Sequence, residues 1–207
     1  MSFEQRVAPQ INARLHALAE LVRRDRGAGV SWATPIPAYA SLLVRFDPLR
    51  LDFDDAFERV EALCGQLGTA PASGAKQLVL EIPVRYGGED GPDLTEVAER
   101  TGLTPAHVIE LHAGTVYLAY MLGFAPGFAY LGTLPEALRL PRLSTPRQSV
   151  PAGSVAIAAA QTAVYPLATP GGWHLIGRTD SVIWDPRRDP PTLIEAGRHV
   201  RFVPVDD

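Results

Sequence analysis

The sequence predicts an α+β protein built from two domains, a small α/β sandwich at residues 1–77 and a β-rich domain at residues 78–207. In the first part, apolar residues recur every three or four positions, which is typical of amphipathic helices. Between residues 116 and 205, glycine and proline recur every few positions between short apolar runs. This spacing excludes a long helix and favours short strands joined by tight turns, as in a closed or strongly bent sheet.

The first domain is predicted to alternate helices and strands. Helical spacing covers residues 7–24 and again 53–67, where Gly65 and Gly68 end the pattern. Residues 39–46 read as a strand, and its continuous apolar run at 42–44 predicts that both faces are buried. Cys64 falls on the apolar stripe of the second helix, which favours a buried structural thiol over a nucleophile.

The second domain is predicted to open with a strand at residues 78–86, after a loop at 70–75. Asp93 and Glu96 have the spacing of a helix capping box. Thr104 followed by proline predicts a second helix that ends near residue 114. His112 lies in the last turn of that helix, where a charged imidazole would interact favourably with the helix dipole.

Composition excludes several classes of partner. The chain has 207 residues and a formal net charge of −4, which argues against nucleic-acid or anionic-membrane binding. Cys64 is the single cysteine, so no intramolecular disulfide is possible. No apolar run approaches the length of a membrane span, and the first ten residues lack the core of a signal peptide. We therefore expect a cytoplasmic protein.

No motif of a self-contained enzyme is present in the sequence. A phosphate-binding GxxxxGK[ST] loop, an HExxH zinc motif and a GxSxG nucleophile elbow are all missing. Five scattered histidines and one cysteine predict no metal site. The chain is thus expected to bind no cofactor by itself.

Polar and aromatic side chains cluster instead in the glycine- and proline-rich loops, which predicts a recognition surface. Arginines there can hold a carboxylate bidentately, and the aromatic rings can cover a flat amide. The competing interpretation is that the arginines form structural ion pairs and that Trp173 is core. The candidate substrate-binding residues are Arg142, Arg147, Gln161, Thr162, Tyr165, Trp173, Arg178 and Thr179.

Four segments of these loops resemble one family. They are GFAPGFAYLG at 123–132, PRLSTPR at 141–147, VPAGSV at 150–155 and PGGWHLIGRT at 170–179. The family is that of the 5-oxoprolinase B subunit, also called allophanate hydrolase subunit 1 or the KipI family. The resemblance extends over nearly the whole chain and implies that the second domain is a cyclophilin-like β-barrel.

The resemblance implies a protein that is not active alone. With the A subunit and the C subunit (allophanate hydrolase subunit 2-like) of 5-oxoprolinase, it is expected to help convert 5-oxo-L-proline to L-glutamate, with ATP used by the complex. The small anionic amide fits the candidate residues, and the resemblance adds His112 to them. Alternatives are a KipI-like inhibitor of a sensor histidine kinase and a subunit of an amidohydrolase that acts on allophanate or urea derivatives. A prolyl isomerase, suggested by the barrel alone, is the weakest alternative.

The chain departs from the family pattern in three places. Ala160 and Ala163 stand where relatives usually have glycine, which predicts strain if either position needs a positive φ. Asp180 replaces the usual proline and adds a negative charge beside the expected anion site. The family also opens with a strand before the first helix, and we expect this chain to lack it, which would leave an open sheet edge.

Overall fold

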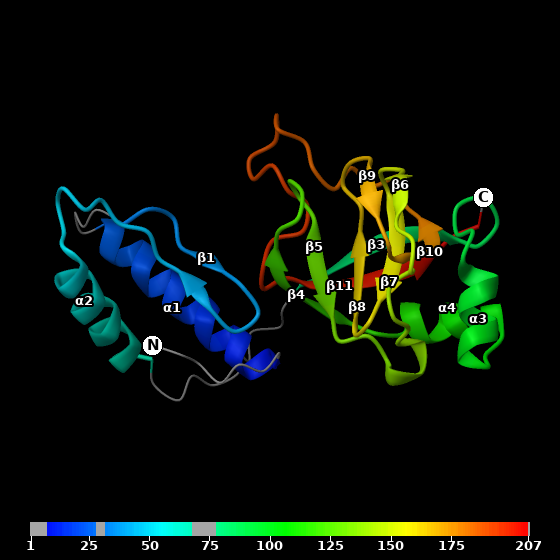
Figure 1. Cartoon of the computed structure of the whole chain (residues 1–207), viewed down its shortest axis with the longest axis horizontal. Coiled ribbons are helices and arrows are strands. Elements are labelled where there is room, and N and C mark those ends of the chain that lie inside the picture. The colour runs from blue at the N-terminus through cyan, green and yellow to red at the C-terminus, as the bar shows by residue number, and fades with distance from the viewer. Residues whose placement is uncertain (1–7, 28–31, 68–77, 207) are drawn as a thin grey trace. The chain divides into compact units, whose positions relative to one another are not determined.

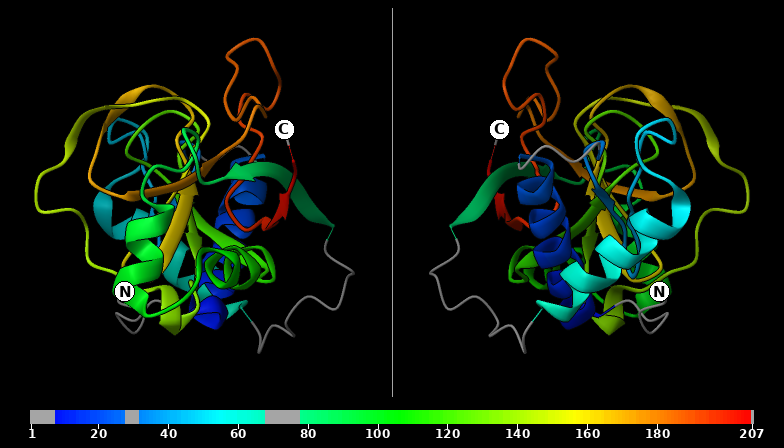
Figure 2. Two further views of the ribbon diagram at one scale, coloured as in Figure 1. Left: turned by 90° about the vertical axis from the view of Figure 1, so that its right-hand side faces the viewer. Right: turned by 90° about the vertical axis from the view of Figure 1, so that its left-hand side faces the viewer.

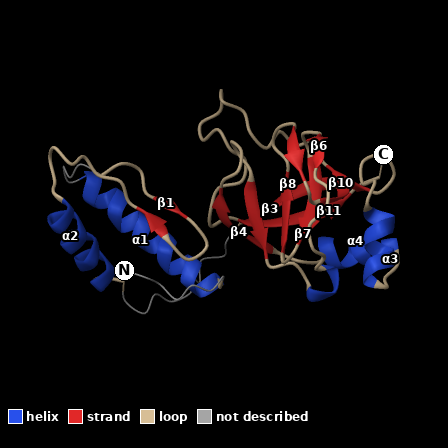
Figure 3. Cartoon of the chain, viewed as in Figure 1, coloured by secondary structure: helices blue, strands red, loops and turns tan. Residues whose placement is uncertain are grey.

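The computed structural model describes residues 8–27, 32–67 and 78–206 (Figure 1). The chain divides into two compact units, residues 1–76 and 77–207. The boundary expected from the sequence lies one residue later, between 77 and 78. Helices and two short strands form the first unit, and most of the strands belong to the second (Figure 3). The additional first strand discussed above falls outside the described residues.

The first unit pairs two helices with a two-stranded antiparallel sheet. Leu18 and Val22 are buried on the inner face of the first helix, as the spacing predicted. The second helix begins after Asp52, whose carboxylate accepts a hydrogen bond from the backbone N–H of Asp55 at 2.9 Å. The elements are α1 (Pro9–Gly27), β1 (Ile36–Pro37), β2 (Leu42–Leu43) and α2 (Phe53–Gly65).

Two predictions for this unit are wrong in detail. The strand expected at 39–46 is reduced to β2, and Leu43 is 53% exposed, so one face of the strand is open. In α2 the buried side chains are Ala56 and Leu63, whereas Phe53 and Phe57 are exposed. The periodicity predicted the helix correctly. It did not predict which face of the helix is buried, because that depends on the elements that pack against it.

The second unit is a closed barrel of seven strands in the order β10-β3-β11-β4-β5-β8-β7 (Figure 3). Strands β3 and β11 pair in parallel, and the other neighbours are antiparallel. A separate two-stranded sheet joins β6 to β9. The strands are β3 (Val79–Tyr86), β4 (Tyr117–Leu122), β5 (Ala129–Gly132), β6 (Arg147–Val150), β7 (Ser154–Ala158), β8 (Gln161–Val164), β9 (Thr169–Gly171), β10 (His174–Arg178) and β11 (His199–Pro204).

Two helices, α3 (Leu94–Thr101) and α4 (Pro105–Ala113), lie next to each other on one side of the barrel, and a short 3-10 turn, η1 (Glu136–Leu138), packs near them (Figures 1 and 2). The cap predicted for α4 is confirmed, since the Thr104 hydroxyl accepts the His107 N–H at 3.2 Å. The capping box predicted for α3 is wrong: Asp93 precedes the helix, but its side chain makes no cap hydrogen bond. That carboxylate is used elsewhere, as described below.

Alternate residues of each barrel strand face inward and form the main core. In β7, Val155 and Ile157 join this core, whereas Ala156 and Ala158 belong to a second apolar cluster on the outer face. The three small alanines at positions 156, 158 and 163 leave room on that outer face for large rings. This second cluster contains two of the predicted recognition residues, Tyr165 and Trp173.

We expect that replacing Ala159 with glycine stabilises the barrel unit modestly, by up to about 1 kcal/mol. Ala159 has a φ of +49° in the turn between β7 and β8, a conformation unfavourable for alanine. Ala160 and Ala163, where strain was predicted, do not have a positive φ, so that prediction is wrong by position. Thermal unfolding of A159G and the matched A160G tests this, and an equal or larger gain from A160G would contradict it.

Candidate functional site

The candidate site lies on the outer face of the barrel wall formed by β7, β8 and β10. Four aromatic rings gather there around a fifth, Phe128, which is 2% exposed. Its ring centre lies 5.0 Å from that of Tyr130, 5.3 Å from Tyr165 and 5.8 Å from Trp173, at interplanar angles of 67°, 79° and 86°. Phe124 meets it from the solvent side at 5.2 Å. Edge-to-face packing of this kind stabilises aromatic clusters and fixes the positions of the rings.

Arg142 places a positive charge over this cluster. Its guanidinium carbon lies 5.9 Å from the centre of the Trp173 ring, within the range of a cation–π contact. Two hydrogen bonds fix the loop that carries Arg142. The Leu143 N–H donates to the Gly172 carbonyl at 2.7 Å, and His174 Nε2–H donates to the Pro141 carbonyl at 2.9 Å. Arg142 itself is exposed. It therefore presents a cation to solvent beside a rigid aromatic surface.

Arg147 serves a structural ion pair instead. Its Nη2 donates to the Asp93 carboxylate at 2.6 Å, and the other oxygen of that carboxylate accepts the Leu175 backbone N–H at 2.6 Å. Asp93 is 6% exposed. The competing interpretation of the sequence, a structural ion pair, thus describes this arginine.

Tyr165 connects the two arginines to the aromatic cluster. Burial raises the pKa of its phenol, an effect partly offset by the charges of Arg142 and Arg147 and by a hydrogen bond from the Trp173 backbone. The hydroxyl is also so close to Gly171 that a Cβ there would lie 2.2 Å from it. Glycine at 171 is needed for this approach. The phenol remains protonated at neutral pH, and the Tyr165 side chain is almost fully buried, at 2% exposed.

His112 and Thr162 lie inside the barrel and are fully buried. The Thr162 hydroxyl donates to the Ala156 carbonyl at 3.1 Å and accepts from His112 Nε2 at 2.8 Å. His112 Nδ1 then accepts from the Tyr86 hydroxyl at 2.7 Å. Burial lowers the pKa of His112 from 6.5 to about 3. The prediction of a charged imidazole at the helix end is therefore wrong. This histidine is neutral, and its hydrogen bonds connect α4 to the barrel strands.

We expect the barrel unit to lose stability as the pH falls from 6.5 toward 3. Over this range the unfolded chain protonates the histidine and the folded one does not, so stability falls by about 1.4 kcal/mol per pH unit. The burial penalty is absent above pH 6.5, where the histidine is neutral in both states. Urea unfolding at about pH 7 and about pH 5 measures this slope. H112N should flatten it, and H107Q, which alters an exposed histidine of the same helix, should not.

The remaining predicted residues lie at the two ends of β7. Gln161 pairs with Ala158 at one end, and Arg178 pairs with Ser154 at the other. Thr179 is 3% exposed, and its hydroxyl accepts the Ser181 N–H at 3.1 Å. The structure thus brings together Arg142, Arg147, Tyr165 and Trp173, while Gln161, Arg178 and Thr179 lie farther along the wall.

Asp180 does not leave an unbalanced charge. Its carboxylate forms a two-pronged contact with Arg85 at 2.6 and 3.1 Å, and Arg85 also binds Asp90 at 2.8 Å. The hydrogen bonds from Arg85 lower the pKa of Asp180, and the charge of Arg178 adds to this effect. The negative charge expected to disturb the anion site is therefore neutralised by an arginine that the sequence did not suggest.

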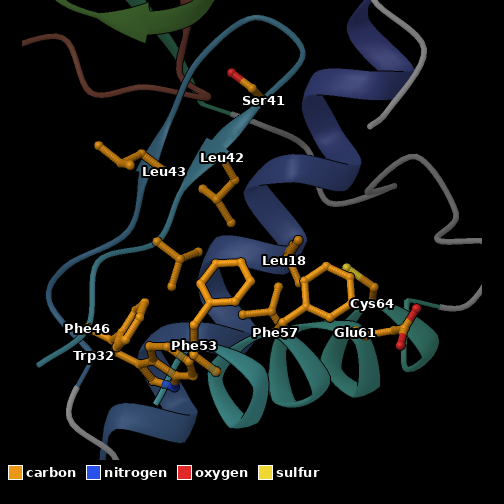
Figure 4. A pocket seen from close by; sticks show the side chains of 13 residues that line it. Leu18, Trp32, Ser41, Leu42, Leu43, Phe46, Phe53, Phe57, Glu61 and Cys64 are labelled. Atoms are coloured by element: carbon orange, nitrogen blue, oxygen red, sulfur yellow. The ribbon is translucent and has the colours of Figure 1, made fainter. Parts of the chain in front are cut away.

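The first unit contains a separate apolar cavity of about 290 Å³ (Figure 4). Aliphatic and aromatic side chains from β2, α1 and α2 line most of it, with Glu61 and Cys64 at one end. Cys64 is half-buried, and burial raises the pKa of its thiol, so it is not an activated nucleophile. In the described parts of the chain, no cluster of histidine, cysteine and carboxylate residues suited to a metal ion occurs. Nor is any described helix long and apolar enough to cross a membrane.

Comparison with known proteins places this arrangement in a family. The model of the family described as carboxyltransferase domain, subdomain C and D, matches residues 1–194. The chain is 40% identical to the 5-oxoprolinase B subunit of Bacillus subtilis (strain 168) over 215 residues, which cover 99% of this chain and 88% of that protein. It is 51% identical to the 5-oxoprolinase B subunit of Escherichia coli O157:H7 over 150 residues, 72% and 67% of the two chains. The chain therefore belongs to the carboxyltransferase subdomain C and D family and, within it, to the B subunits of 5-oxoprolinase.

Solved structures share the fold. The crystal structure of TTHA0988 matches with a TM-score of 0.86 at 40% identity over the whole of this chain, which spans only 39% of the TTHA0988 chain. The Kluyveromyces lactis urea carboxylase matches with a TM-score of 0.75 over 98% of this chain and 20% of its own. At 18% identity, that second match shows the fold alone.

Proposed function

We propose that this chain is the B subunit of an ATP-dependent 5-oxoprolinase, which acts with the A and C subunits to open the lactam of 5-oxo-L-proline to L-glutamate. The observation that carries the proposal is the 40% identity to a 5-oxoprolinase B subunit across nearly the full length of both proteins. In this proposal the complex uses ATP, and the chain itself binds no cofactor.

The outer face of the barrel supplies a binding surface that suits this substrate. Arg142 can hold the substrate carboxylate through charge-assisted hydrogen bonds, and the rigid ring system under it fixes where the guanidinium lies. The charges of Arg142 and Arg147 both act on the protonated phenol of Tyr165 and lower its pKa. Positioning of this kind lowers a barrier without a nucleophile in the chain.

Release of glutamate from 5-oxoproline and ATP tests the proposal, with the chain co-expressed with the A and C subunits. The matched control omits only this chain. We expect release that requires all three proteins. A well-formed complex that releases no glutamate would contradict the reaction and favour a urea derivative as substrate or a role as a kinase inhibitor.

A further inference from the structure

Phe124 is the feature of the second unit that folding does not explain. Its side chain is 62% exposed, and its φ is +68°, in the left-handed region that bulky residues avoid. Among the described residues, the other non-glycine with a positive φ is the small Ala159. Phe124 packs against Phe128, but most of its side chain is exposed, and backbone strain of this kind is concentrated at functional positions.

The loop around Phe124 holds the ring in one place. Residues 123–128 connect β4 to β5 and are closed by hydrogen bonds between Gly123 N–H and the Phe128 carbonyl at 3.0 Å and between Phe128 N–H and the Ala125 carbonyl at 3.0 Å. Gly127 has a φ of +79° and lies so close to Trp184 that a Cβ would meet the Trp184 Cβ at 2.6 Å. Hydrogen bonds therefore fix the conformation of this loop, and the Phe124 ring packs against the Phe128 ring.

A second apolar surface adjoins this loop. Trp184 belongs to the loop between β10 and β11, which projects from the barrel in Figures 1 and 2. On that loop, Val182 is 59% exposed and lines a hollow together with Trp184 and Leu167. Arg187 and Arg188 line the same hollow. The patch thus offers two exposed apolar side chains with arginines beside them.

We propose that this patch, formed by the loops at residues 123–128 and 182–188, is a docking surface for a partner polypeptide and that Phe124 is its anchor. Aromatic side chains flanked by arginine are typical of the energetically important positions in protein interfaces. The partner is expected to present an apolar pocket for Phe124. Relatives of this chain are named as subunits, and the TTHA0988 chain continues well beyond the shared fold, so polypeptide is the occupant that the comparisons favour over a small ligand.

The identity of the partner, a protein of the same complex, rests on the proposed function. The dissociation constant between this chain and the purified C subunit, or the A and C subunits together, tests the docking surface by calorimetry. F124G removes the ring and relieves the backbone strain, so it should fold and weaken binding about 30-fold. F124Y keeps the ring and should bind as the unmodified chain does.

The control is L78S, which alters an exposed apolar residue next to the start of β3, at the end of the barrel away from the 123–128 loop. It should leave binding unchanged, and thermal unfolding should show that F124G is at least as stable as the unmodified chain. Equal binding by F124G, or weakening by L78S as large as that by F124G, would overturn the proposal. So would an F124G complex of full affinity that has a raised KM, because Phe124 would then contact substrate. A wild-type complex that assembles but releases no glutamate refutes the proposed function and leaves the docking surface standing.

Discussion

Replacing Asp93 with alanine is expected to lower the free energy of unfolding of the barrel unit by about 3 kcal/mol. The Asp93 carboxylate is buried and receives two short hydrogen bonds, one from Arg147 and one from the Leu175 backbone, both at 2.6 Å. Its loss leaves a partly buried guanidinium and a buried N–H without partners, and each unsatisfied group destabilises the fold. Chemical denaturation followed by circular dichroism measures the change.

Two further variants show whether the charge or the hydrogen bond matters. D93N keeps an acceptor for the Leu175 N–H but removes the charge opposite Arg147, and we expect a smaller loss than in D93A. Glu96 is exposed on α3, the helix that follows Asp93, and forms an ion pair with Arg100 at the surface. E96A removes only that pair and should change the free energy of unfolding by less than about 0.5 kcal/mol. If D93A lost no more than E96A, the ion pair would not contribute as we describe.

Asp93 also shows what local spacing can and cannot predict. The pattern from 93 to 96 correctly marks the start of α3, because helix starts depend on residues a few positions apart. Which groups the carboxylate binds is decided by Leu175, 82 positions away, after β10 has been placed against the loop before the helix. A single sequence carries no signal for that contact.

Which face of a helix is buried also depends on contacts with residues far away in the sequence. The spacing in α2 predicted a helix, yet Phe53 and Phe57 are exposed while Ala56 is buried, because the inner face is chosen by what packs against it. In the barrel, apolar residues alternate along the sequence from Leu78 through Leu80 and Ile82 to Val84. Ile82 and Val84 are buried in the core, whereas Leu78, just before β3, is 81% exposed. A strand has only two faces, so its pattern leaves fewer alternatives.

The sequence placed Arg142, Tyr165 and Trp173 among the candidate site residues, and the structure brings these three together. Trp173 is 5% exposed and belongs to a buried apolar cluster, as the competing interpretation predicted. Residue type and loop position were not enough to separate Arg142 from Arg147, because an arginine that binds a ligand and one that binds a buried carboxylate look alike in sequence. Phe124 was overlooked as an individual residue, although the glycines on either side of it signal a tight loop. Its exposure and its positive φ became visible only in three dimensions.

Replacing Arg142 with alanine is expected to reduce kcat/KM for 5-oxoproline in the assembled complex about 100-fold, which corresponds to the loss of one charge-assisted contact of about 2 to 3 kcal/mol. Arg142 is exposed, and its guanidinium lies over the Trp173 ring. Because it forms no ion pair with any residue that the structure describes, it is available to bind a carboxylate. For the same reason R142A should unfold at nearly the same denaturant concentration as the unmodified chain. Steady-state kinetics with varied 5-oxoproline, together with denaturation, measures both effects.

Arg147 provides the contrast that makes this prediction specific. R147A removes the partner of a buried carboxylate, so we expect a clear loss of stability, whereas R142A should lose activity without that loss. R100A, which alters an exposed arginine on α3, should change neither quantity. Full activity in a correctly assembled R142A complex would remove Arg142 as the carboxylate-binding group.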